Sequence, residues 1–423
     1  MYRIDLSADE LSAKLLSIAA AGGSVAMLDS CGVGHLGSHL LIAGLEEHFS
    51  ESISDQDPER SLRRFEELTG KGLSAIFTLS YSLGEKLCGI APSVSSEPDI
   101  FVRLFRNLIM HDYDTGETWI TGEAGNCAAI EETLLKTVPL LPPEIISSPQ
   151  VVSNFSREDY VSAVKVIQQH IRRGDTYQTN LTRGISFELP YGTTPEHIFA
   201  RLRRDHPAPF AAFIKRPDSS VISASPERFF RIEDRDISVS PIKGTRARGN
   251  SPDSDAKLRQ ELERSEKDRA ENIMIVDLMR NDLGRVCEFG SVRAESICVV
   301  EEHPTLFHMV STVKGRLRPE AGIADTLRAV FPCGSITGAP KISTMRIIRE
   351  LEPAPRGLSM GAIGSFQPES GIFDVSVAIR TMTVRAGFAA FNVGGGIVID
   401  SDPETEYDET VTKSRALLAA SGA

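Results

Sequence analysis

Apolar and polar residues recur along the chain with two different periods, which predicts a mixture of helices and strands. Apolar residues at helical spacing predict a helix over 160–173, with the capping-box-like run Ser156-Arg-Glu-Asp before it and Gly174-Asp175 after it. A longer helix is expected over about 253–279. Strand-like runs are expected at residues 219–224, 236–239 and 374–384. Because strands alternate with helices and hairpin-like neighbours also occur, the pattern favours an α+β fold of antiparallel sheets flanked by helices.

A proline-rich stretch interrupts this pattern. Residues 137–155 contain four prolines and lead directly into the predicted start of the 160–173 helix. We therefore expect an N-terminal region over 1–140 and a larger domain over 155–423 that carries the candidate chemistry, without requiring that the two be separable. The length of 423 residues is sufficient to bury a large core.

Charge and cysteine usage narrow the class of protein. The formal net charge is −12, which argues against a general nucleic-acid binder because phosphate contacts need clustered lysine and arginine. The six cysteines include no C-x-x-C pair, which favours free thiols in a reducing compartment. The N-terminus lacks the pattern of a signal peptide, and no apolar run reaches the roughly 18 residues of a membrane span. We therefore expect a cytoplasmic protein without membrane contact.

Carboxylates on two predicted helices are candidate metal ligands. Glu271 is followed by apolar residues at i+4 and i+7, which places its side chain on an inward-facing stripe. In the C-terminal helix, which Asp402 can cap, Glu406, Glu409 and Lys413 share one face. Carboxylate oxygens without nearby cysteine or histidine suit Mg²⁺. Alternatively, both helices present solvated faces with ordinary ion pairs.

Two glycine-rich segments and one arginine are candidates for binding an anion. The loop 331–341 leads into a helix whose free N–H groups and dipole can hold an anion. Glycines 394–396 follow a predicted strand and permit close approach of a ligand. Arg380 is expected within a strand, on the same face as Ser376 and Ala378, where it can grip a carboxylate. Alternatively, the glycines form a bulge and Arg380 points to water.

Taken together, these motifs resemble those of the chorismate-utilising enzymes, a family that includes anthranilate, isochorismate, salicylate and aminodeoxychorismate synthases. The resemblance covers about residues 155–420 and implies the family's fold, a sandwich of antiparallel sheets flanked by helices. The matching stretches are GDTYQTNLT (174–182), SASPERF (223–229), PIKGTRARG (241–249), EKDRAENIMIVDLMRNDLGRV (266–286), HMVSTVKG (308–315), FPCGSITGAPK (331–341), AIRT (378–381), GGGIV (394–398) and EYDETVTK (406–413).

The resemblance implies a binding site for chorismate and Mg²⁺. Glu271 and Glu409 match the Mg²⁺ ligands of the family, with Glu406 in support. The residues implied in substrate binding are Gln178, Thr245, His308, Thr337, Gly338, Arg380, Gly395, Gly396 and Lys413. Within this set, Arg380 and the N–H groups near the two glycines would seat the enolpyruvyl carboxylate.

Two residues, Lys243 and Gln178, select the reaction within the family. Lys243 stands where the anthranilate and isochorismate branches usually have alanine, and it implies the aminodeoxychorismate branch, in which the lysine amine attacks C2 of the ring. Desolvation and a nearby Mg²⁺ would keep that amine neutral. Glu227 is the implied general acid and base. Gln178 replaces the lysine base of water-using relatives, which implies ammonia as the nucleophile, supplied from glutamine by a separate glutamine amidotransferase subunit.

Several alternatives remain open. The first is the large subunit of an anthranilate synthase, and the second is an inactive relative that only binds tryptophan or a partner. The segment at Asp29 and Ser30 resembles the tryptophan-binding motif of relatives, although it can equally be an ordinary strand end. Ser365 stands where relatives usually have tyrosine, and we expect a contact to the substrate carboxylate to be missing there.

Overall fold

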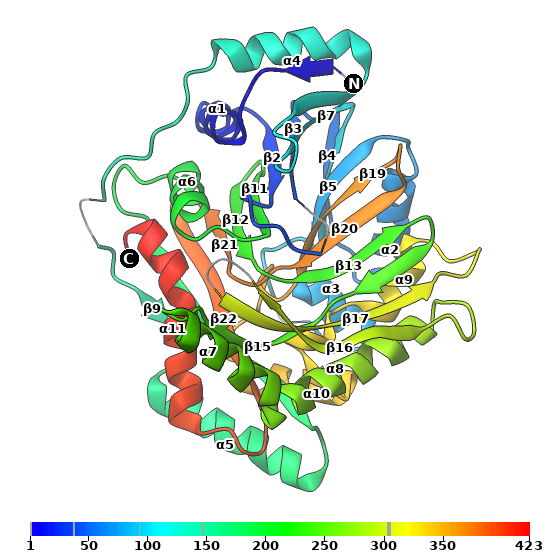
Figure 1. The fold of residues 1–423 in the computed structure, drawn as a ribbon, viewed down its shortest axis with the longest axis vertical. Coiled ribbons are helices and arrows are strands. Elements are labelled where there is room, and N and C mark those ends of the chain that lie inside the picture. Colours follow the sequence, from blue (N-terminus) through cyan, green and yellow to red (C-terminus); the bar gives the residue numbers. More distant parts are fainter. Residues whose placement is uncertain (1, 37–38, 93, 146–147, 303–305) are drawn as a thin grey trace.

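Two large antiparallel sheets form the centre of the molecule (Figure 1). The computed structural model describes residues 2–36, 39–92, 94–145, 148–302 and 306–423. The first sheet has the strand order β1 (Tyr2–Ile4), β8 (Thr118–Gly122), β7 (Asn107–Asp112), β3 (Leu40–Leu45), β2 (Val25–Asp29), β11 (Phe210–Lys215), β12 (Ser219–Ser225), β21 (Thr381–Arg385), β22 (Phe388–Ile397), β10 (Gln178–Glu188) and β18 (Gly338–Ala339), with β9 (Val152–Ser153) also on β10.

The second sheet begins with the strand that carries Lys243. Its order is β15 (Ile242–Ala247), β17 (Leu306–Arg316), β14 (Asp236–Val239), β13 (Arg228–Glu233), β20 (Ile372–Val377), β19 (Ala362–Gln367), β5 (Ser74–Leu79), β6 (Ile100–Phe105) and β4 (Phe49–Ile53), with β16 (Arg293–Glu302) also on β17. The helices are α1 (Ala8–Ala20), α2 (Pro58–Thr69), α3 (Tyr81–Leu87), α4 (Ala124–Lys136), α5 (Arg157–Arg173), α6 (Pro195–Asp205), α7 (Pro252–Arg264), α8 (Glu266–Gly284), α9 (Ile323–Val330), α10 (Lys341–Leu351), α11 (Pro403–Ser421) and the short 3-10 helix η1 (Gly334–Ile336).

The core consists of layers, as the alternation of buried positions requires. Residues of both sheets, among them Ile214 of β11 and Ile363 of β19, form one apolar cluster between the sheets. Helices α1, α6 and α11 cover the outer face of the first sheet, and α2, α8 and α9 cover that of the second. The α+β sandwich expected from the sequence is confirmed.

The predicted helix ends are confirmed by their capping contacts. Ser156 accepts a hydrogen bond from the N–H of Asp159 at the start of α5, and Gly174 ends that helix with a φ of 80°. Asp402 accepts from the N–H of Thr405 at the start of α11. These short-range contacts explain why sequence alone places both helices well.

The helix expected over 253–279 is in fact two helices, so that prediction is wrong. The chain turns at Ser265, whose ψ of 105° ends α7, and its hydroxyl accepts from the N–H of Asp268 to start α8. A serine inside an otherwise helical pattern can cap as well as continue a helix, and here it caps. The break gives the helix that carries Glu271 its own direction.

The prediction of a single strand over 374–384 is also wrong, because these residues form parts of two strands that belong to different sheets. β20 ends at Val377 in the second sheet, and β21 begins at Thr381 in the first. Arg380 lies between them with a φ of 48°, a left-handed conformation that turns the chain. Arg380 therefore shares no strand face with Ser376, contrary to the expectation.

The passage from one sheet to the other between Val377 and Thr381 is one crossing of the chain. A second crossing lies beside it and contains Glu227. The chain passes from β12 in the first sheet to β13 in the second between Ser225 and Arg228. The two crossings are joined by hydrogen bonds from the Val377 N–H to the Glu227 carbonyl (3.0 Å) and from the Ala224 N–H to the Arg380 carbonyl (3.0 Å). The fold thus brings these two candidate residues to one corner of the sandwich.

The segments before and after the proline-rich stretch share both sheets. β2 pairs with β11, and β5 pairs with β19. Residues 1–140 and 155–423 therefore build one continuous pair of sheets.

A buried ion pair fixes the strand and loop that border the candidate site. Arg356 binds Glu352 through Nε (2.8 Å) and Nη2 (2.7 Å) and also donates to the carbonyls of Ile336 (2.9 Å) and Asn180 (2.6 Å). Both charged side chains are almost fully buried. The pair therefore ties β10 to η1.

Replacement of Arg356 by alanine is expected to lower the free energy of unfolding by about 3–5 kcal/mol, because the Glu352 carboxylate would remain buried without its partner. Denaturant unfolding measures this change. Arg280→Ala, which removes an exposed pair with Asp277, serves as the control and is expected to have little effect. Equal midpoints for the two variants would contradict the prediction.

Two further observations bear on expectations from the sequence. Within the part of the chain that the structure describes, none of the helices combines the length and the apolar character that crossing a membrane would require. All six cysteines are free thiols.

Candidate active site

Lys243 lies in a bulge at the edge of the second sheet. β15 pairs with β17 at Ile242 and again at Thr245, with a shift of register between them. Gly244 has a φ of 77°, and a Cβ atom there would lie 2.7 Å from Leu262 and 2.9 Å from the Asp268 carboxylate carbon. Only glycine suits such a position. The Lys-Gly pair therefore forms a β-bulge that requires glycine, and the half-buried side chain of Lys243 projects from this bulge.

Glu227 is buried beside Lys243. Burial raises the pKa of the Glu227 carboxyl, while the Ser335 hydroxyl, the charge of Lys243 and the N–H of Ile242 act in the opposite direction. Its Oε1 atom is buried and has no hydrogen-bond partner among the described residues. A carboxyl with a raised pKa and a free oxygen is suited to giving and taking a proton.

Three carboxylates gather on the other side of Lys243. Burial raises the pKa of Glu271, opposed by the charge of Lys243 and assisted by that of Glu409. Burial also raises the pKa of Glu406, and the charge of Glu409 adds to it. Lys413 pairs with Glu409 at 2.6 Å and donates to the Gly394 carbonyl at 3.0 Å. Charges on α8 and α11, the two helices predicted to carry acidic residues, thus act on one another.

The donor set of this cluster fits a hard cation. Across the described ranges, no three His, Cys, Asp or Glu side chains lie close enough to form a metal site by themselves. Mg²⁺, however, often takes only one or two carboxylates and completes its shell with water and substrate oxygens. The charge of Glu409 raises the pKa values of Glu271 and Glu406, and a bound cation would relieve this repulsion.

Gln178 is buried with its side-chain amide unsatisfied among the described residues. It is fully buried, and neither Nε2 nor Oε1 has a hydrogen-bond partner among the described residues. Gly396 lies directly against Nε2, and Gly338 lies against the Gln178 carbonyl, so that a Cβ atom at either glycine would overlap them. An unsatisfied buried amide is costly unless a ligand supplies its partner. Gln178 is therefore a candidate contact for substrate or nucleophile.

The Gly396→Ala variant tests this arrangement. The added methyl group would displace the flexible end of Gln178 while leaving the backbone pairing of β22 with β10 intact. We expect turnover of chorismate to fall by about tenfold or more with little loss of stability. Gly125→Ala in α4 is a suitable control, because a Cβ atom there meets nothing within 4 Å. Unchanged turnover in the Gly396 variant would remove Gln178 from the site.

The glycine run lies inside β22 rather than after it, which corrects the sequence-based expectation. Gly395 pairs with Leu181 of β10, and a Cβ atom at Gly395 would lie 3.2 Å from Glu406 Oε2 and 3.7 Å from Glu409 Oε1. β21 pairs with β22 only at the far end, from Phe388 to Ala390. The glycine end of the strand is thus bordered by α11 and its acidic residues.

Arg380 is a candidate anion ligand. Its side chain is half-buried, and burial lowers the pKa of its guanidinium. Among the described residues, no carboxylate forms an ion pair with it. A desolvated guanidinium without an acidic partner is suited to binding a carboxylate of a ligand.

The remaining predicted binding residues are Thr245, His308 and Thr337. Thr245 and His308 lie opposite each other on β15 and β17, and Thr245 Oγ1 and His308 Nδ1 share a hydrogen bond of 2.9 Å. Thr337 is fully buried, and its carbonyl accepts from the N–H of Asn180 at 2.8 Å. Its own hydroxyl donates to the Cys333 carbonyl at 3.0 Å. Of these three, Thr245 is the exposed one.

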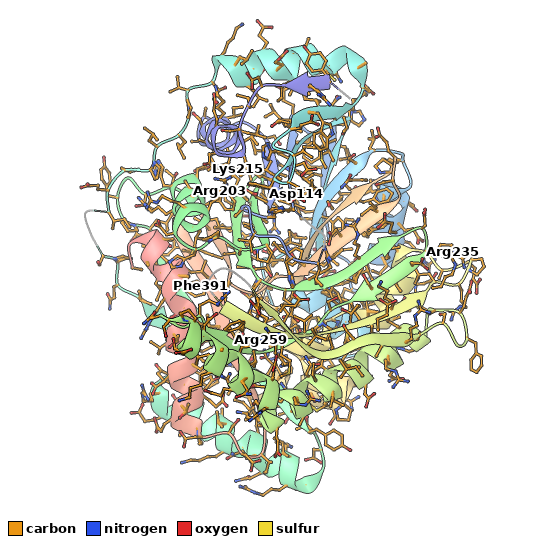
Figure 2. All side chains as sticks on the ribbon, in the orientation of Figure 1. Asp114, Arg203, Lys215, Arg235, Arg259 and Phe391 are labelled. Atoms are coloured by element: carbon orange, nitrogen blue, oxygen red, sulfur yellow. The ribbon has the colours of Figure 1, made fainter. Side chains whose placement is uncertain are left out.

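Asp29 and Ser30 lie in a separate place, at a cavity of about 150 Å³ between the two sheets. Asp29 accepts from Arg203 Nε (2.7 Å), the Tyr113 hydroxyl (2.7 Å) and the Cys31 N–H (2.7 Å), so its carboxylate is fully engaged. Arg203 is labelled in Figure 2 near the N-terminal strands. The buried Ser30 hydroxyl has no hydrogen-bond partner among the described residues and lines the cavity.

Ser365 lines this same cavity and not the space around Lys243. It lies on β19, opposite Asp374 of β20, which is also part of the cavity wall. The expectation that Ser365 removes a contact to the substrate carboxylate is therefore wrong. Strand alternation sends its side chain between the sheets.

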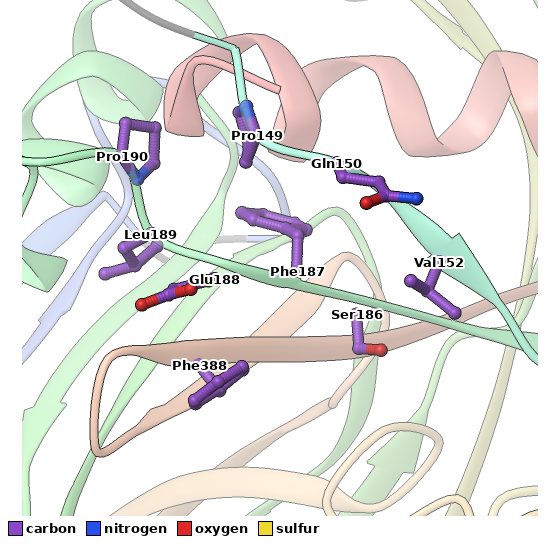
Figure 3. A pocket seen from close by; sticks show the side chains of 9 residues that line it. All are labelled: Pro149, Gln150, Val152, Ser186, Phe187, Glu188, Leu189, Pro190 and Phe388. Atoms are coloured by element: carbon purple, nitrogen blue, oxygen red, sulfur yellow. The ribbon is translucent and has the colours of Figure 1, made fainter.

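Another depression lies at the opposite end of β10 (Figure 3). It is lined by Pro149, Gln150, Val152, Ser186, Phe187, Glu188, Leu189, Pro190 and Phe388. Ser186 is eight residues along β10 from Gln178, or roughly 26 Å at the rise of a strand. This depression is therefore separate from the candidate site.

Two residues at the site were missed in the sequence. The Ser335 hydroxyl lowers the pKa of Glu227, and it stands in the FPCGSITGAPK motif, where a hydroxyl between two glycines was the available sign. Lys267 acts electrostatically on both Glu271 and Glu406, and its spacing of four residues before Glu271 on one helix was the available sign.

Comparison with known proteins agrees with this fold. The profile of the chorismate binding enzymes matches residues 28–419, and the chain belongs to that family. It is 40% identical over 347 residues to aminodeoxychorismate synthase component 1 of Klebsiella aerogenes, covering 81% of this chain and 76% of that protein.

Two further relatives belong to the anthranilate branch. The chain is 42% identical over 279 residues to anthranilate synthase component 1 1 of Haloarcula marismortui, covering 66% of this chain and 56% of that protein. The crystal structure of anthranilate synthase component I from Streptococcus pneumoniae superposes with a TM-score of 0.79 at 26% identity, over 91% of this chain and 93% of that one. Component 1 of the aminodeoxychorismate synthases of Salmonella typhimurium and Escherichia coli is 42% and 44% identical to the chain over 308 and 266 residues, so the comparisons support the aminodeoxychorismate branch.

Proposed function

We propose that this chain converts chorismate and ammonia to 4-amino-4-deoxychorismate, the precursor of 4-aminobenzoate and folate. The observation that carries the proposal is the position of Lys243, whose charge acts on both Glu227 and Glu271. A lysine between a protonatable carboxyl and a metal-binding carboxylate can serve as a nucleophile. Similarity to aminodeoxychorismate synthase component 1 supports the same branch.

Substrate would be held by opposite charges at its two carboxylates. Glu271 and Glu409, supported by Glu406, would hold Mg²⁺, which when bound neutralises the carboxylate on the chorismate ring. The Arg380 guanidinium would bind the enolpyruvyl carboxylate, with the N–H groups at Gly395 beside it. Bound in this way, the ring would lie with its reacting carbons between Lys243 and Glu227.

The reaction would proceed in two displacements. The neutral Lys243 amine attacks C2 of the ring, the double bond shifts, and the C4 oxygen leaves as water with the proton that Glu227 gives it. Ammonia then adds at C4, the double bond returns, and the C2–nitrogen bond to Lys243 breaks. Glu227 takes the surplus proton from the new amine, which restores the starting state.

Ammonia would come from glutamine through a partner amidotransferase subunit. Gln178 cannot deprotonate water, but its unsatisfied amide can accept a hydrogen bond from ammonia or donate one to the substrate. The reaction would take place in the cytoplasm, a reducing compartment that suits the free thiols.

Product analysis with purified protein, chorismate, Mg²⁺ and ammonium salt tests the proposal. Aminodeoxychorismate should accumulate, and 4-aminobenzoate should form only when a lyase is added. Glutamine alone should not replace ammonia, and chelation with EDTA should stop turnover. Anthranilate fluorescence without added lyase would support the second candidate, an anthranilate synthase large subunit, which the Haloarcula relative favours.

A further inference from the structure

Arg228 follows Glu227 directly and is one of the most constrained arginines in the molecule. It is 3% exposed and is the first residue of β13. Its guanidinium binds Asp374 of β20 through Nε (2.9 Å) and Nη2 (3.0 Å), a bidentate pair. Its Nη1 donates to the Leu36 carbonyl at 2.8 Å. Three contacts thus fix the plane of the guanidinium.

The same strand also holds the backbone of Glu227. The Val377 N–H at the end of β20 donates to the Glu227 carbonyl, and the Ser225 hydroxyl donates to the Val377 carbonyl at 2.6 Å. The main chain of Glu227 is therefore hydrogen-bonded to β20. The side chain of the next residue, Arg228, is bound to β20 through Asp374. Glu227 and Arg228 are adjacent residues at the point where the chain enters β13, so the backbone that Arg228 and Val377 hold is the backbone that carries the Glu227 side chain.

The segment that contains Leu36 reaches a second part of the site. Its His35 pairs with Glu301 of β16 at 3.2 Å. Glu301 lies directly opposite His308 in the sheet. Arg228 thus contacts a segment that borders His308 as well as the strand that holds Glu227.

We propose that Arg228 is a positioning residue that, through its bidentate pair with Asp374, sets the direction of the Glu227 carboxyl toward the oxygen leaving C4. The inference rests on the proposed function of Glu227. Arg228 does not contact the reacting atoms and acts through the turn it shares with Glu227. A displacement of about 1 Å in an acid catalyst is enough to slow a reaction by up to 10²-fold.

The groups that face Glu227 itself come from other elements. They are Lys243 of β15, Lys413 of α11, and Ser335 and Cys333 at η1. These groups and burial set the proton affinity of Glu227, and Arg228 sets its direction. Loosening the turn would hydrate the carboxyl and return its raised pKa toward the ordinary range, because burial is the main cause of the shift.

Arg228→Lys, compared with Arg231→Lys, tests the inference. Arg231 lies on the same strand and its Nη1 contacts the same carboxylate at 3.2 Å, but it is not next to Glu227. Lysine keeps the charge and loses the bidentate geometry. With chorismate and ammonium as substrates, kcat for chorismate consumption should fall by about 10- to 100-fold in the Arg228 variant, with KM little changed.

A pH profile separates positioning from a loss of folded protein. In the Arg228 variant the alkaline limb of kcat should move to lower pH, whereas partial unfolding would lower the amplitude and leave the limb in place. Arg231→Lys should keep both rate and limb. Asp374→Asn, which breaks the pair from the other side, should reproduce the Arg228 result if Arg228→Lys does not fold.

Two outcomes would overturn the inference. Equal losses in the Arg228 and Arg231 variants would make the effect one of general stability, and an unmoved limb with normal kcat would show that the pair does not act on Glu227. Glu227→Gln is measured alongside. Wild-type turnover in that variant would reject the proposed acid and the inference with it, whereas loss of turnover in it beside a normal Arg228 variant would reject only the inference.

Discussion

Replacement of Lys243 by alanine is expected to slow conversion of chorismate on the order of 10³-fold or more, because the variant lacks the amine that we propose as the nucleophile at C2. The bulge that carries the residue depends on Gly244 and on pairing of β15 with β17, neither of which involves the lysine side chain. The protein should therefore fold normally. Steady-state assays of chorismate consumption with ammonium measure the loss.

Binding experiments with the same variant distinguish catalysis from affinity. Chorismate should still bind in the presence of Mg²⁺, because the carboxylates and Arg380 remain. Lys314→Ala, which removes an exposed lysine paired with Glu295 on β17, serves as the control and should keep wild-type turnover. An alanine variant at 243 with normal activity would exclude the lysine from the mechanism.

The sequence predicts the ends of helices well, because these ends depend on short stretches of the chain. Ser156 and Asp402 cap helices through contacts within three residues. Motifs such as the one around Lys243 specify a local bulge, and the bulge is present. Structural features that depend on contacts between neighbouring residues can therefore be predicted from a single sequence.

The changes of sheet could not be read in the same way. Residues 374–384 have the composition of one strand, yet the chain leaves the second sheet at Val377 and enters the first at Thr381. Nothing in an alternation of apolar residues states which neighbour a strand will pair with. The left-handed φ of Arg380 is imposed by pairing on both sides, as with Ala224.

The position of Ser365 was misjudged for a related reason. Its motif lies near residues of the site in sequence, but it belongs to β19, whose alternate side chains enter the cavity between the sheets. A sequence motif identifies a residue but does not show in which direction its side chain points. The direction of a strand side chain depends on register, which only the assembled sheets define.

The two neighbouring crossings bring the proposed acid and the proposed carboxylate ligand to one corner of the sandwich, where we propose that they act on the same substrate molecule. Glu227 lies in one crossing and Arg380 in the other, and two backbone hydrogen bonds keep them in register. An acid and an anion ligand held on the same rigid corner keep a constant separation. Such preorganisation lowers the reorganisation needed during reaction.

Replacement of Glu227 by glutamine is expected to lower kcat by about 10²- to 10⁴-fold, the usual contribution of a general acid. Glutamine has nearly the same shape and cannot supply a proton. Glu196→Gln is the matched control, because Glu196 of α6 is also buried, forms an ion pair with Lys215 at 3.0 Å and belongs to none of the motifs of the site. That control should turn over chorismate within about twofold of the wild-type rate.

The pH dependence of kcat tests whether Glu227 acts as a proton donor. A general acid works only while protonated, so wild-type activity should decline as pH rises through the pKa of Glu227. Burial raises this pKa, which moves the decline toward neutral pH and keeps the acid form available under conditions where an exposed glutamate is ionised. The glutamine variant should lose this alkaline limb while keeping its residual rate. A limb that persists unchanged in the variant would belong to another group, and Glu227 would then not be the proton donor.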